Sequence, residues 1–397
     1  MDMVFVYEDK IAQDASGNYY TGSAFSQEIF DRYLQHFDHI TLLMRKADVD
    51  PNDMQTLSKM NRINTERIKV VILPNAAASL QSFMDPRVHT QFKQTILKEL
   101  KSDRAVIIRA PSTSGTIAAD YCRTQGRLYL AEAVGCPWDS LWNHSIKGKM
   151  LAPRMWMGFR RTMKYADYAV YVTKEFLQRR YPSRGETAAI SDVELQPMDE
   201  IILGKRMKKI QNHSGAIKIG TAGALNVAYK GQNYMIEALA KLKAMGNADY
   251  EYHLAGSGDM SVLRHLAERL GVSDQVFFDG ALRHDQMFQW FDDLDVYIQP
   301  STVESMPRAL IEAMSRGLPS FGSMVGGIPE LLDEDFIFPR EDATAIASKF
   351  RQLSTDQMVF MSERNFEHAK QFQREILQNR RFEFYSAFAA AAKEKLK

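Results

Sequence analysis

Short apolar segments alternate with longer amphipathic segments along the first half of the chain. The short segments are rich in β-branched and aromatic residues, and the continuous apolar stretch 105–108 suits a strand covered on both faces. We expect strands at residues 2–7, 39–44, 69–73, 104–110, 127–134 and 167–173. We expect helices at residues 23–36, 87–101, 114–124, 150–165 and 174–180. Strand–helix alternation of this kind predicts parallel βαβ units.

The same alternation restarts in the second half of the chain. We expect strands at residues 217–219, 251–255, 275–279, 294–298, 319–321 and 336–338. The segment 231–245 predicts a helix, because its apolar residues recur at helical spacing, and the tail from 361 to 397 is also helical in pattern. The polar, basic stretch 203–215 between the two halves is interpreted as a linker. The chain is therefore expected to be an α/β protein with domains at residues 1–204 and 205–375.

Composition and charge exclude several classes of protein. The length of 397 residues fits two domains of roughly 150–200 residues. Fifty Lys and Arg residues balance 49 Asp and Glu residues, so charge gives no reason to expect nucleic-acid binding. The two cysteines, Cys122 and Cys136, suggest neither a disulfide framework nor a zinc site. With no signal-peptide pattern and no apolar run of ~18 residues, we expect a cytoplasmic protein, at most peripheral at the inner face of the membrane.

The segment 299–330 carries the strongest chemical pattern. A strand ends at Pro300 and Ser301, Glu304 lies in the following loop, and a helix is expected to begin near Pro307. Glu312 lies on that helix, eight residues after Glu304. Free N–H groups at a helix N-terminus, here residues 305–308, suit a phosphate or a sugar. The alternative for each glutamate is a solvated surface carboxylate.

This segment resembles the E-x7-E signature of glycosyltransferase family 4, which has the GT-B fold. The matching residues are Pro300, Ser301, Glu304, Glu312, Ala313, Met314, Gly317, Pro319, Gly326, Gly327 and Glu330. The resemblance implies two Rossmann-like, doubly wound domains facing a central cleft, with a C-terminal helix, residues 376–397, packing back on the first domain. It also implies that Glu304 contacts the donor sugar and Glu312 the ribose. Pro307 departs from the family, where many members carry a glycine, and lacks an N–H donor.

The resemblance extends upstream of the signature. Residues 220–225 followed by Lys230 look like the phosphate-binding stretch of the family, in which the lysine neutralises the diphosphate; Ala224 replaces the usual arginine. The alternative for Lys230 is a surface lysine at a helix entry. The donor-site residues implied by the resemblance, besides Lys230 and the two glutamates, are Gly22, Gly223, Gly256, Gly258, Ala281, Leu282, Ser305, Met306 and Arg308. Asp293 and Asp295 superficially resemble a metal-binding pair, but we interpret them as structural and expect no metal site.

Two features of the first half are chemically ambiguous. The loop 14–22 matches the Gly-rich loop of the family at Gly22, although an ordinary β–α turn with Ser23 as N-cap is the alternative. Arg109 and Glu132 interrupt apolar strands, where a charge is costly unless it is paired or faces a cleft. They form a structural ion pair or line the acceptor pocket, and both interpretations stay open. The catalytic candidates are thus Glu304, Lys230 and Arg109; the histidine that many family members carry in the first domain is not found.

The stretch 147–164 mixes basic residues with large apolar ones. It suits either peripheral contact with an anionic membrane or a core-packing helix with a solvated basic face.

The resemblance to glycosyltransferase family 4 implies a retaining glycosyltransferase that moves a hexose-type sugar from a nucleoside-diphosphate sugar to a saccharide or lipid-linked acceptor. UDP is favoured over GDP, no cofactor beyond the donor as co-substrate is expected, and the pathway would be bacterial surface-polysaccharide assembly. The alternatives are a sugar-nucleotide epimerase on the same fold and a non-catalytic sugar-nucleotide-binding subunit. A nucleotide-linked dehydrogenase is disfavoured, because the full G-x-G-x-x-G fingerprint is missing.

Overall fold

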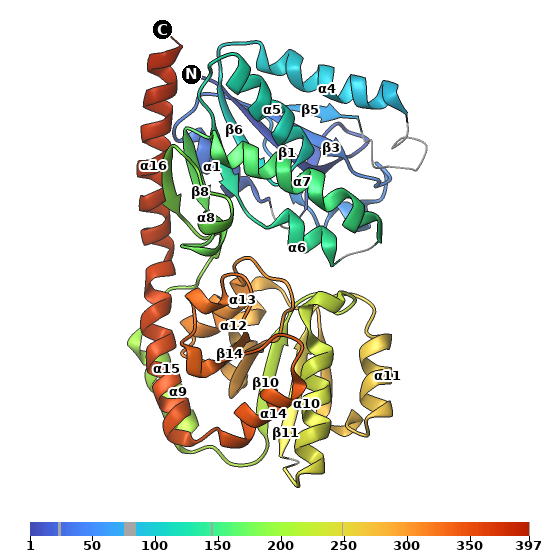
Figure 1. The fold of residues 1–397 in the computed structure, drawn as a ribbon, viewed down its shortest axis with the longest axis vertical. Helices are drawn as coiled ribbons and strands as arrows, with labels where there is room; N and C mark the ends of the chain where they lie inside the picture. The colour runs from blue at the N-terminus through green and yellow to red at the C-terminus, as the bar shows by residue number, and fades with distance from the viewer. Residues whose placement is uncertain (23–24, 75–84, 144–145, 248, 397) are drawn as a thin grey trace. The chain divides into compact units, whose positions relative to one another are not determined.

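A computed structural model describes residues 1–22, 25–74, 85–143, 146–247 and 249–396. The chain packs into two compact units, which Figure 1 shows. The first unit contains residues 1–172, 177–190 and 379–397, and the second contains residues 173–176 and 191–378.

The first unit is built on a mostly parallel sheet. Its parallel strands follow the order β5-β3-β1-β6-β7-β8-β9. Their bounds are β1 (Met3–Gln13), β3 (Ile40–Lys46), β5 (Ile68–Leu73), β6 (Ala105–Ala110), β7 (Leu130–Ala133), β8 (Tyr168–Tyr171) and β9 (Glu186–Ala189). All six strands predicted for this half are present. Strand order reverses between β1 and β6, as in a doubly wound sheet.

Helices cover both faces of this sheet. One layer contains α4 (Pro86–Leu100), α5 (Thr113–Thr124), α6 (Pro137–Trp142) and α7 (Ile146–Lys164), which pack against one another. The first unit also contains α1 (Gln27–Leu34), the short α2 (Met54–Leu57) and most of α8 (Phe176–Arg180). Val4, Val106 and Ile107 lie in the core with no exposed surface, because apolar strands of a parallel sheet are covered on both sides. The predicted N-cap Ser23 lies outside the described residues.

The second unit has a fully parallel six-stranded sheet. Its strand order, β12-β11-β10-β13-β14-β15, is that of a Rossmann fold, with the reversal between β10 and β13. The bounds are β10 (Ile217–Ala222), β11 (Tyr250–Ala255), β12 (Val276–Gly280), β13 (Val296–Gln299), β14 (Ser320–Ser323) and β15 (Ile337–Phe338). The α/β class with two Rossmann-like sheets is therefore confirmed.

Two helical layers enclose the second sheet. One contains α10 (Gln232–Ala244), α11 (Ser261–Arg269) and α14 (Ala343–Gln352). The other contains α9 (Glu200–Gln211), α12 (His284–Asp293), α13 (Arg308–Ser315) and α15 (Thr355–Ala369). Among the described helices of the whole chain, none is long and apolar enough to cross a membrane.

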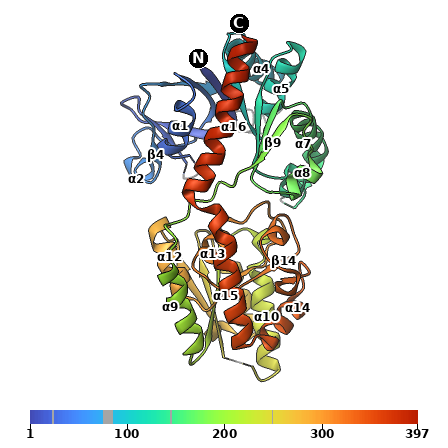
Figure 2. The same cartoon turned by 90° about the vertical axis from the view of Figure 1, so that its left-hand side faces the viewer.

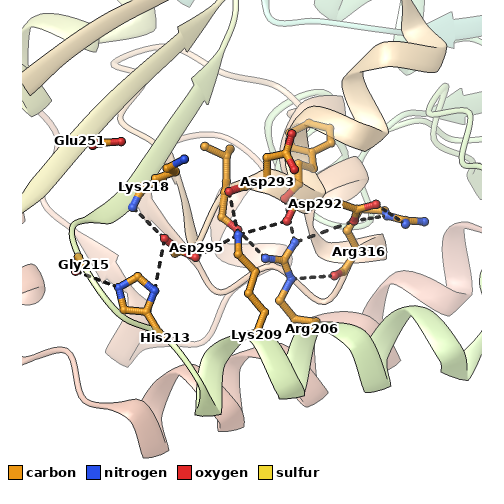
Figure 3. Close-up of polar contacts among 12 residues, drawn as sticks. Arg206, Lys209, His213, Gly215, Lys218, Glu251, Asp292, Asp293, Asp295 and Arg316 are labelled. Carbon is orange, nitrogen blue, oxygen red and sulfur yellow. Dashed lines mark hydrogen bonds and ion pairs between the residues drawn. The ribbon is translucent and has the colours of Figure 1, made fainter.

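The interpretation of residues 203–215 as a linker is wrong. Most of this stretch is α9, which belongs wholly to the second unit, so the predicted boundary at residue 204 falls inside a helix. Figure 3 shows the partners of two of its basic residues, Arg206 and Lys209. The guanidinium of Arg206 is buried and donates to backbone carbonyls at the end of α12, including that of Phe291 at 2.7 Å. Burial lowers the pKa of Arg206 to about 10.

The acidic residues around α9 are structural. The Asp295 carboxylate accepts from the Lys218 backbone N–H at 2.9 Å and pairs with Lys209 at 3.0 Å and His213 at 3.7 Å (Figure 3). Lys209 Nζ also donates to the Asp293 carbonyl at 2.7 Å. Cations at a helix C-terminus satisfy its free carbonyls, so this cluster fastens α9 to the end of α12. Asp295 thus has the predicted structural role, whereas Asp293 contributes its backbone carbonyl and has an exposed side chain.

The last helix, α16 (Arg374–Lys395), begins in the second unit, and its residues from Asn379 onward belong to the first. Figure 2 shows it running past α1 and β9 within the first unit. Its aromatic residues pack there: the Tyr385 ring lies 5.6 Å from that of Tyr33, and the Phe388 ring lies 5.5 Å from that of Tyr168. These contacts bury one side of a helix whose sequence looks largely polar.

Candidate active site

Lys230 and Glu304 lie at the strand-order reversal of the second sheet. The strands β10 and β13 are neighbours, and Lys230 follows the first while Glu304 follows the second. In an open α/β sheet the carboxyl ends of the strands at such a reversal form the ligand-binding position. The fold therefore brings together two residues that are 74 positions apart in sequence.

The two side chains form an ion pair. Lys230 Nζ lies 2.9 Å from Glu304 Oε2, and the side chains are only 23% and 13% exposed. The same oxygen accepts from the Ser301 hydroxyl at 3.2 Å, and Gln299 Nε2 donates to it at 3.4 Å. Gln299 is itself fixed, because its Oε1 accepts from the buried Tyr297 hydroxyl at 2.8 Å. A partly buried, preoriented cation of this kind can stabilise negative charge that develops on a ligand at this edge.

The loop that carries Glu304 is held from two sides by close backbone contacts. Gly231 adopts φ +74°, and a Cβ there would lie 1.9 Å from the Pro300 carbonyl oxygen. Gly326 adopts φ +58°, and a Cβ there would lie 1.8 Å from the Glu304 carbonyl oxygen. Only glycine allows both the positive φ and the close approach. Gly231 and the signature residue Gly326 therefore fix the backbone of the loop that carries Glu304.

Glu312 lies on α13 and pairs with His284. Its Oε1 is 3.7 Å from His284 Nε2, and the Glu312 side chain is 13% exposed. The hydrogen bond to Glu312 raises the pKa of His284. Burial raises the pKa of the Tyr297 phenol, and the charges of Glu312 and Glu304 raise it further. Sequence reasoning missed His284, although its position two residues after the implied donor-site residue Leu282 was a usable signal.

Small residues line the carboxyl edge of the second sheet next to Lys230 and Glu304. Gly256 donates its N–H to the Gly280 carbonyl at 2.7 Å, and a Cβ on it would lie 1.8 Å from the Gly223 carbonyl oxygen. Gly258 adopts φ +120° beside Asn226. Ala281, which follows β12, is exposed. The predicted glycines thus form one continuous edge across β10, β11 and β12, where a ligand can approach the backbone closely.

The helix α13 begins one residue later than expected. Pro307 is its N-cap residue, and Arg308 is its first helical residue, with an exposed side chain. Ser305 and Met306 are half-buried, and the Ser305 carbonyl accepts from the Gly327 N–H at 2.7 Å. Because proline has no N–H, its place outside the helix leaves the first-turn N–H groups of α13 intact.

Glu330, the last residue of the signature, has a structural role. Its carboxylate accepts from three consecutive backbone N–H groups: those of Lys174 at 2.6 Å, Glu175 at 3.1 Å and Phe176 at 2.6 Å. These residues belong to the segment 173–176, which is part of the second unit although the chain on either side of it is in the first. Glu330 therefore fixes the short segment 173–176 to the second unit.

Replacing Glu330 with alanine is expected to lower the free energy of unfolding by about 1–3 kcal/mol, because it removes a charged acceptor from three N–H groups. Urea unfolding followed by circular dichroism measures the loss. Glu334→Ala, a change at an exposed residue, is the matched control and should change stability by less than about 0.5 kcal/mol. Equal stability of the two variants would contradict this role of Glu330.

In the first unit, Arg109 and Glu132 form a buried ion pair. Arg109 Nη1 donates to Glu132 Oε2 at 2.8 Å, and the side chains are 14% and 4% exposed. Glu132 Oε1 accepts from the hydroxyls of Tyr33 at 2.7 Å and Tyr385 at 2.5 Å. The Arg109 guanidinium also lies 5.2 Å from the centre of the Phe25 ring. Of the two open interpretations, the structural ion pair is therefore present, and Glu132 joins β7 to α1 and α16.

The loop 14–22 differs from the prediction. Strand β1 continues to Gln13 and forms an antiparallel hairpin with β2 (Tyr19–Thr21), which pairs in turn with β4 (Asn61–Arg62). The Asp14 carboxylate stabilises the turn, because it accepts from the Asn18 N–H at 2.8 Å. Gly22 follows β2 rather than β1, and its carbonyl accepts from Asn61 Nδ2 at 2.9 Å. A simple β–α loop was expected here because the turn residues gave no signal for the short strand after them.

A groove of about 870 Å³ lies in the first unit between α4, α5 and α7. Glu8 and Arg45, from β1 and β3, line it together with Thr113 at the start of α5. Basic side chains reach it from α4 and α7, including Lys93 and Arg154. Sequence reasoning did not identify this groove, because its residues come from five separate elements.

Comparison with known proteins agrees with this geometry. Residues 216–356 match the family model described as glycosyl transferases group 1. Protein CapJ of Staphylococcus aureus is 29% identical over 353 residues, which cover 87% of this chain and 84% of CapJ. The putative colanic acid biosynthesis glycosyltransferase WcaL of Escherichia coli K12 is 35% identical over 143 residues, covering 33% of this chain and 35% of WcaL.

A solved structure extends the likeness to both units. Anabaena Alr3699/HepE in complex with UDP superposes with a TM-score of 0.63 over 98% of this chain and all of that chain, at 16% identity. At this identity the likeness shows the fold alone. Together with the group 1 match of residues 216–356, which lie in the second unit, it shows that this chain is a glycosyltransferase of the GT-B fold.

Proposed function

We propose that the chain transfers a hexose-type sugar from a nucleoside-diphosphate sugar to a saccharide or lipid-linked acceptor, with retention of anomeric configuration. The observation that carries this proposal is the Lys230–Glu304 pair at the carboxyl edge of the second sheet. UDP is the proposed nucleoside diphosphate of the donor, since the structural neighbour HepE binds UDP. Bacterial surface-polysaccharide assembly is the proposed setting, in line with the names of relatives such as WcaL.

In this reaction the bond between the anomeric carbon and the diphosphate oxygen breaks, and the diphosphate leaves with the bonding electrons. The acceptor hydroxyl forms the new bond on the same face of that carbon, and its proton passes to the departing diphosphate oxygen. Lys230 would neutralise the charge that develops on the diphosphate, because a preoriented cation stabilises charge best where it appears. Glu304 would accept hydrogen bonds from the sugar hydroxyls and fix the position of the ring. Glu312 would accept from the ribose.

We propose the glycine edge of β10–β12 as the nucleotide-binding surface. Gly223, Gly256 and Gly258 allow close approach of the donor, and Ala281 and Leu282 lie next to the base. Further donor contacts are proposed for Ser305, Met306 and Arg308 at the start of α13. In the first unit, the groove of about 870 Å³ is the proposed acceptor site. Gly22 is proposed as a further donor contact and Arg109 as a catalytic contact, each to be tested by substitution.

A thermal-shift panel of UDP, GDP, ADP, their common sugar conjugates and NAD tests the donor class. A ligand at ~100 times its dissociation constant adds about 2.7 kcal/mol of stability, which shifts the unfolding temperature measurably. We expect a selective shift with UDP and with one UDP-sugar. A shift with GDP derivatives alone would correct the base, and a shift with NAD alone would overturn the proposal. Turnover of the donor without any acceptor would favour the epimerase.

A further inference from the structure

The outer face of α6 and α7 combines exposed apolar side chains with basic ones. Met150 is 79% exposed, Met157 57% and Trp142 40%, and all three are large apolar residues. In Figure 1, α6 and α7 lie at the front of the first unit. Five of the thirteen exposed large apolar residues in the described chain lie between Trp142 and Tyr165, so this exposure is concentrated rather than scattered. Exposed apolar clusters of this kind mark interaction sites.

The charges on this face have one sign. The segment 140–166 contains no Asp or Glu, whereas its helix carries exposed Lys147, Lys149, Arg154 and Arg160. The nearby carboxylates are already paired: Asp120 with Arg161 at 2.5 Å and Asp139 with Arg180 at 2.7 Å. The face therefore presents a net positive charge although the whole chain carries only +1.

The aromatic residues of the face are arranged as a platform. The rings of Trp138 and Trp142 stack with centres 4.9 Å apart, and Trp156 meets Trp138 edge-on at 6.2 Å. Lys149 Nζ lies 5.9 Å from the centre of the Trp142 ring, and the Arg160 guanidinium lies 5.2 Å from that of Trp156. Tryptophan is enriched at membrane–water interfaces, where basic side chains reach lipid headgroups and their aliphatic stems cover apolar surface.

We propose that the α6–α7 face binds the surface of an anionic lipid bilayer. Its exposed methionine and tryptophan side chains enter the headgroup region, and its lysine and arginine side chains pair with lipid phosphates. The charge selects this occupant over a second copy of the chain, because two identical positive faces repel each other. Arg154 and Met157 lie on this face and also line the acceptor groove, so the bilayer would lie beside that groove. Vesicle binding requires no turnover, so its outcome is independent of the proposed reaction.

Co-sedimentation of the full chain with two kinds of vesicle tests the proposal. We expect binding to vesicles that contain phosphatidylglycerol and little binding to phosphatidylcholine alone. Binding should weaken from about 0.15 M to about 1 M salt, as the Debye length falls from about 8 Å to about 3 Å. Equal binding to both kinds of vesicle, or none to either, would overturn the proposal.

Two pairs of matched variants locate the surface. The double variant Lys149→Glu, Arg160→Glu should lower the vesicle partition coefficient by at least about thirtyfold, since each basic side chain near the membrane surface raises that coefficient about fivefold. Lys205→Glu with Lys208→Glu makes the same charge change at exposed positions of α9 and should leave binding within about threefold. Met150→Asp should weaken binding more than Met245→Asp, another exposed methionine. Equal losses of vesicle binding within either pair would contradict the proposal. It would also be contradicted if the parent chain did not bind vesicles but formed a dimer in solution that Met150→Asp dissociates.

Discussion

Glu304→Gln is expected to lose about a hundredfold to a thousandfold in kcat/KM for sugar transfer, the range typical for removal of one oriented electrostatic group. Glutamine keeps the shape of the side chain but removes the charge that pairs with Lys230 at 2.9 Å. The affinity for the free nucleoside diphosphate should stay within about threefold, since the proposed contact of Glu304 is to the sugar. Initial rates with the identified donor and acceptor, together with calorimetric titration of the nucleotide, separate the two effects.

Lys230→Met is the companion variant for this site. This variant should lower both the turnover rate and the affinity for the nucleoside diphosphate, because the proposed partner of Lys230 is the departing diphosphate. The double variant should lose much less than the product of the two single losses, since residues that act as a unit are not additive. Glu334→Gln, the same change at an exposed residue, is the control and should behave as the parent chain. Glu304→Gln with more than half of the parent activity would show that the pair is only structural.

Glu132→Ala is expected to destabilise the first unit by about 3–5 kcal/mol, which is the usual cost of removing one partner from a buried ion pair. The substitution leaves the Arg109 guanidinium without the carboxylate that it contacts at 2.8 Å, and it removes the acceptor shared by Tyr33 and Tyr385. For a unit of about 200 residues the loss should lower the unfolding temperature by roughly 10 °C. Differential scanning calorimetry measures it on the parent chain and the variant.

Three variants make this result specific. Tyr385→Phe removes one donor and should cost about 1–2 kcal/mol. Glu66→Ala replaces an exposed glutamate of the same unit and should change stability by less than about 0.5 kcal/mol. Glu132→Gln keeps an acceptor for the tyrosines and should fall between Tyr385→Phe and Glu132→Ala. A Glu132→Ala variant as stable as Glu66→Ala would show that the charge cluster does not hold α16 in the first unit.

The order of strands and helices could be read from the sequence because each element has its own local signal. Apolar stretches such as residues 105–108 are long enough to define buried strands, and the helix around Leu239 repeats its apolar residues at helical spacing. The segment from Pro300 to Glu330 carried the candidate site, since turn residues, a strand end and two glutamates follow one another at fixed spacing. Two parallel sheets follow from this alternation, and the structure has both.

Only the tertiary structure decided which residues meet. Lys230 and Glu304 meet because β10 and β13 are neighbours in the sheet. Their separation of 74 residues in sequence does not indicate this contact. Arg206 looked like part of a solvated linker, because a basic residue in a polar stretch has no local signal for burial. Its guanidinium is nevertheless satisfied by carbonyls at the end of α12, far away in sequence. The partner of Glu132 at Tyr385 is likewise 253 residues distant.

The physical reason is the range of each interaction. Backbone conformation and side-chain periodicity act over a few residues, so the sequence by itself determined the α/β class, the strands and the segment that carries the signature. Pairing of charges, burial of polar groups and the shape of a groove depend on surfaces that come together only when the sheets assemble. The Lys230–Glu304 contact and the cluster of four elements at Glu132 belong to that second class, and the structure alone supplied them.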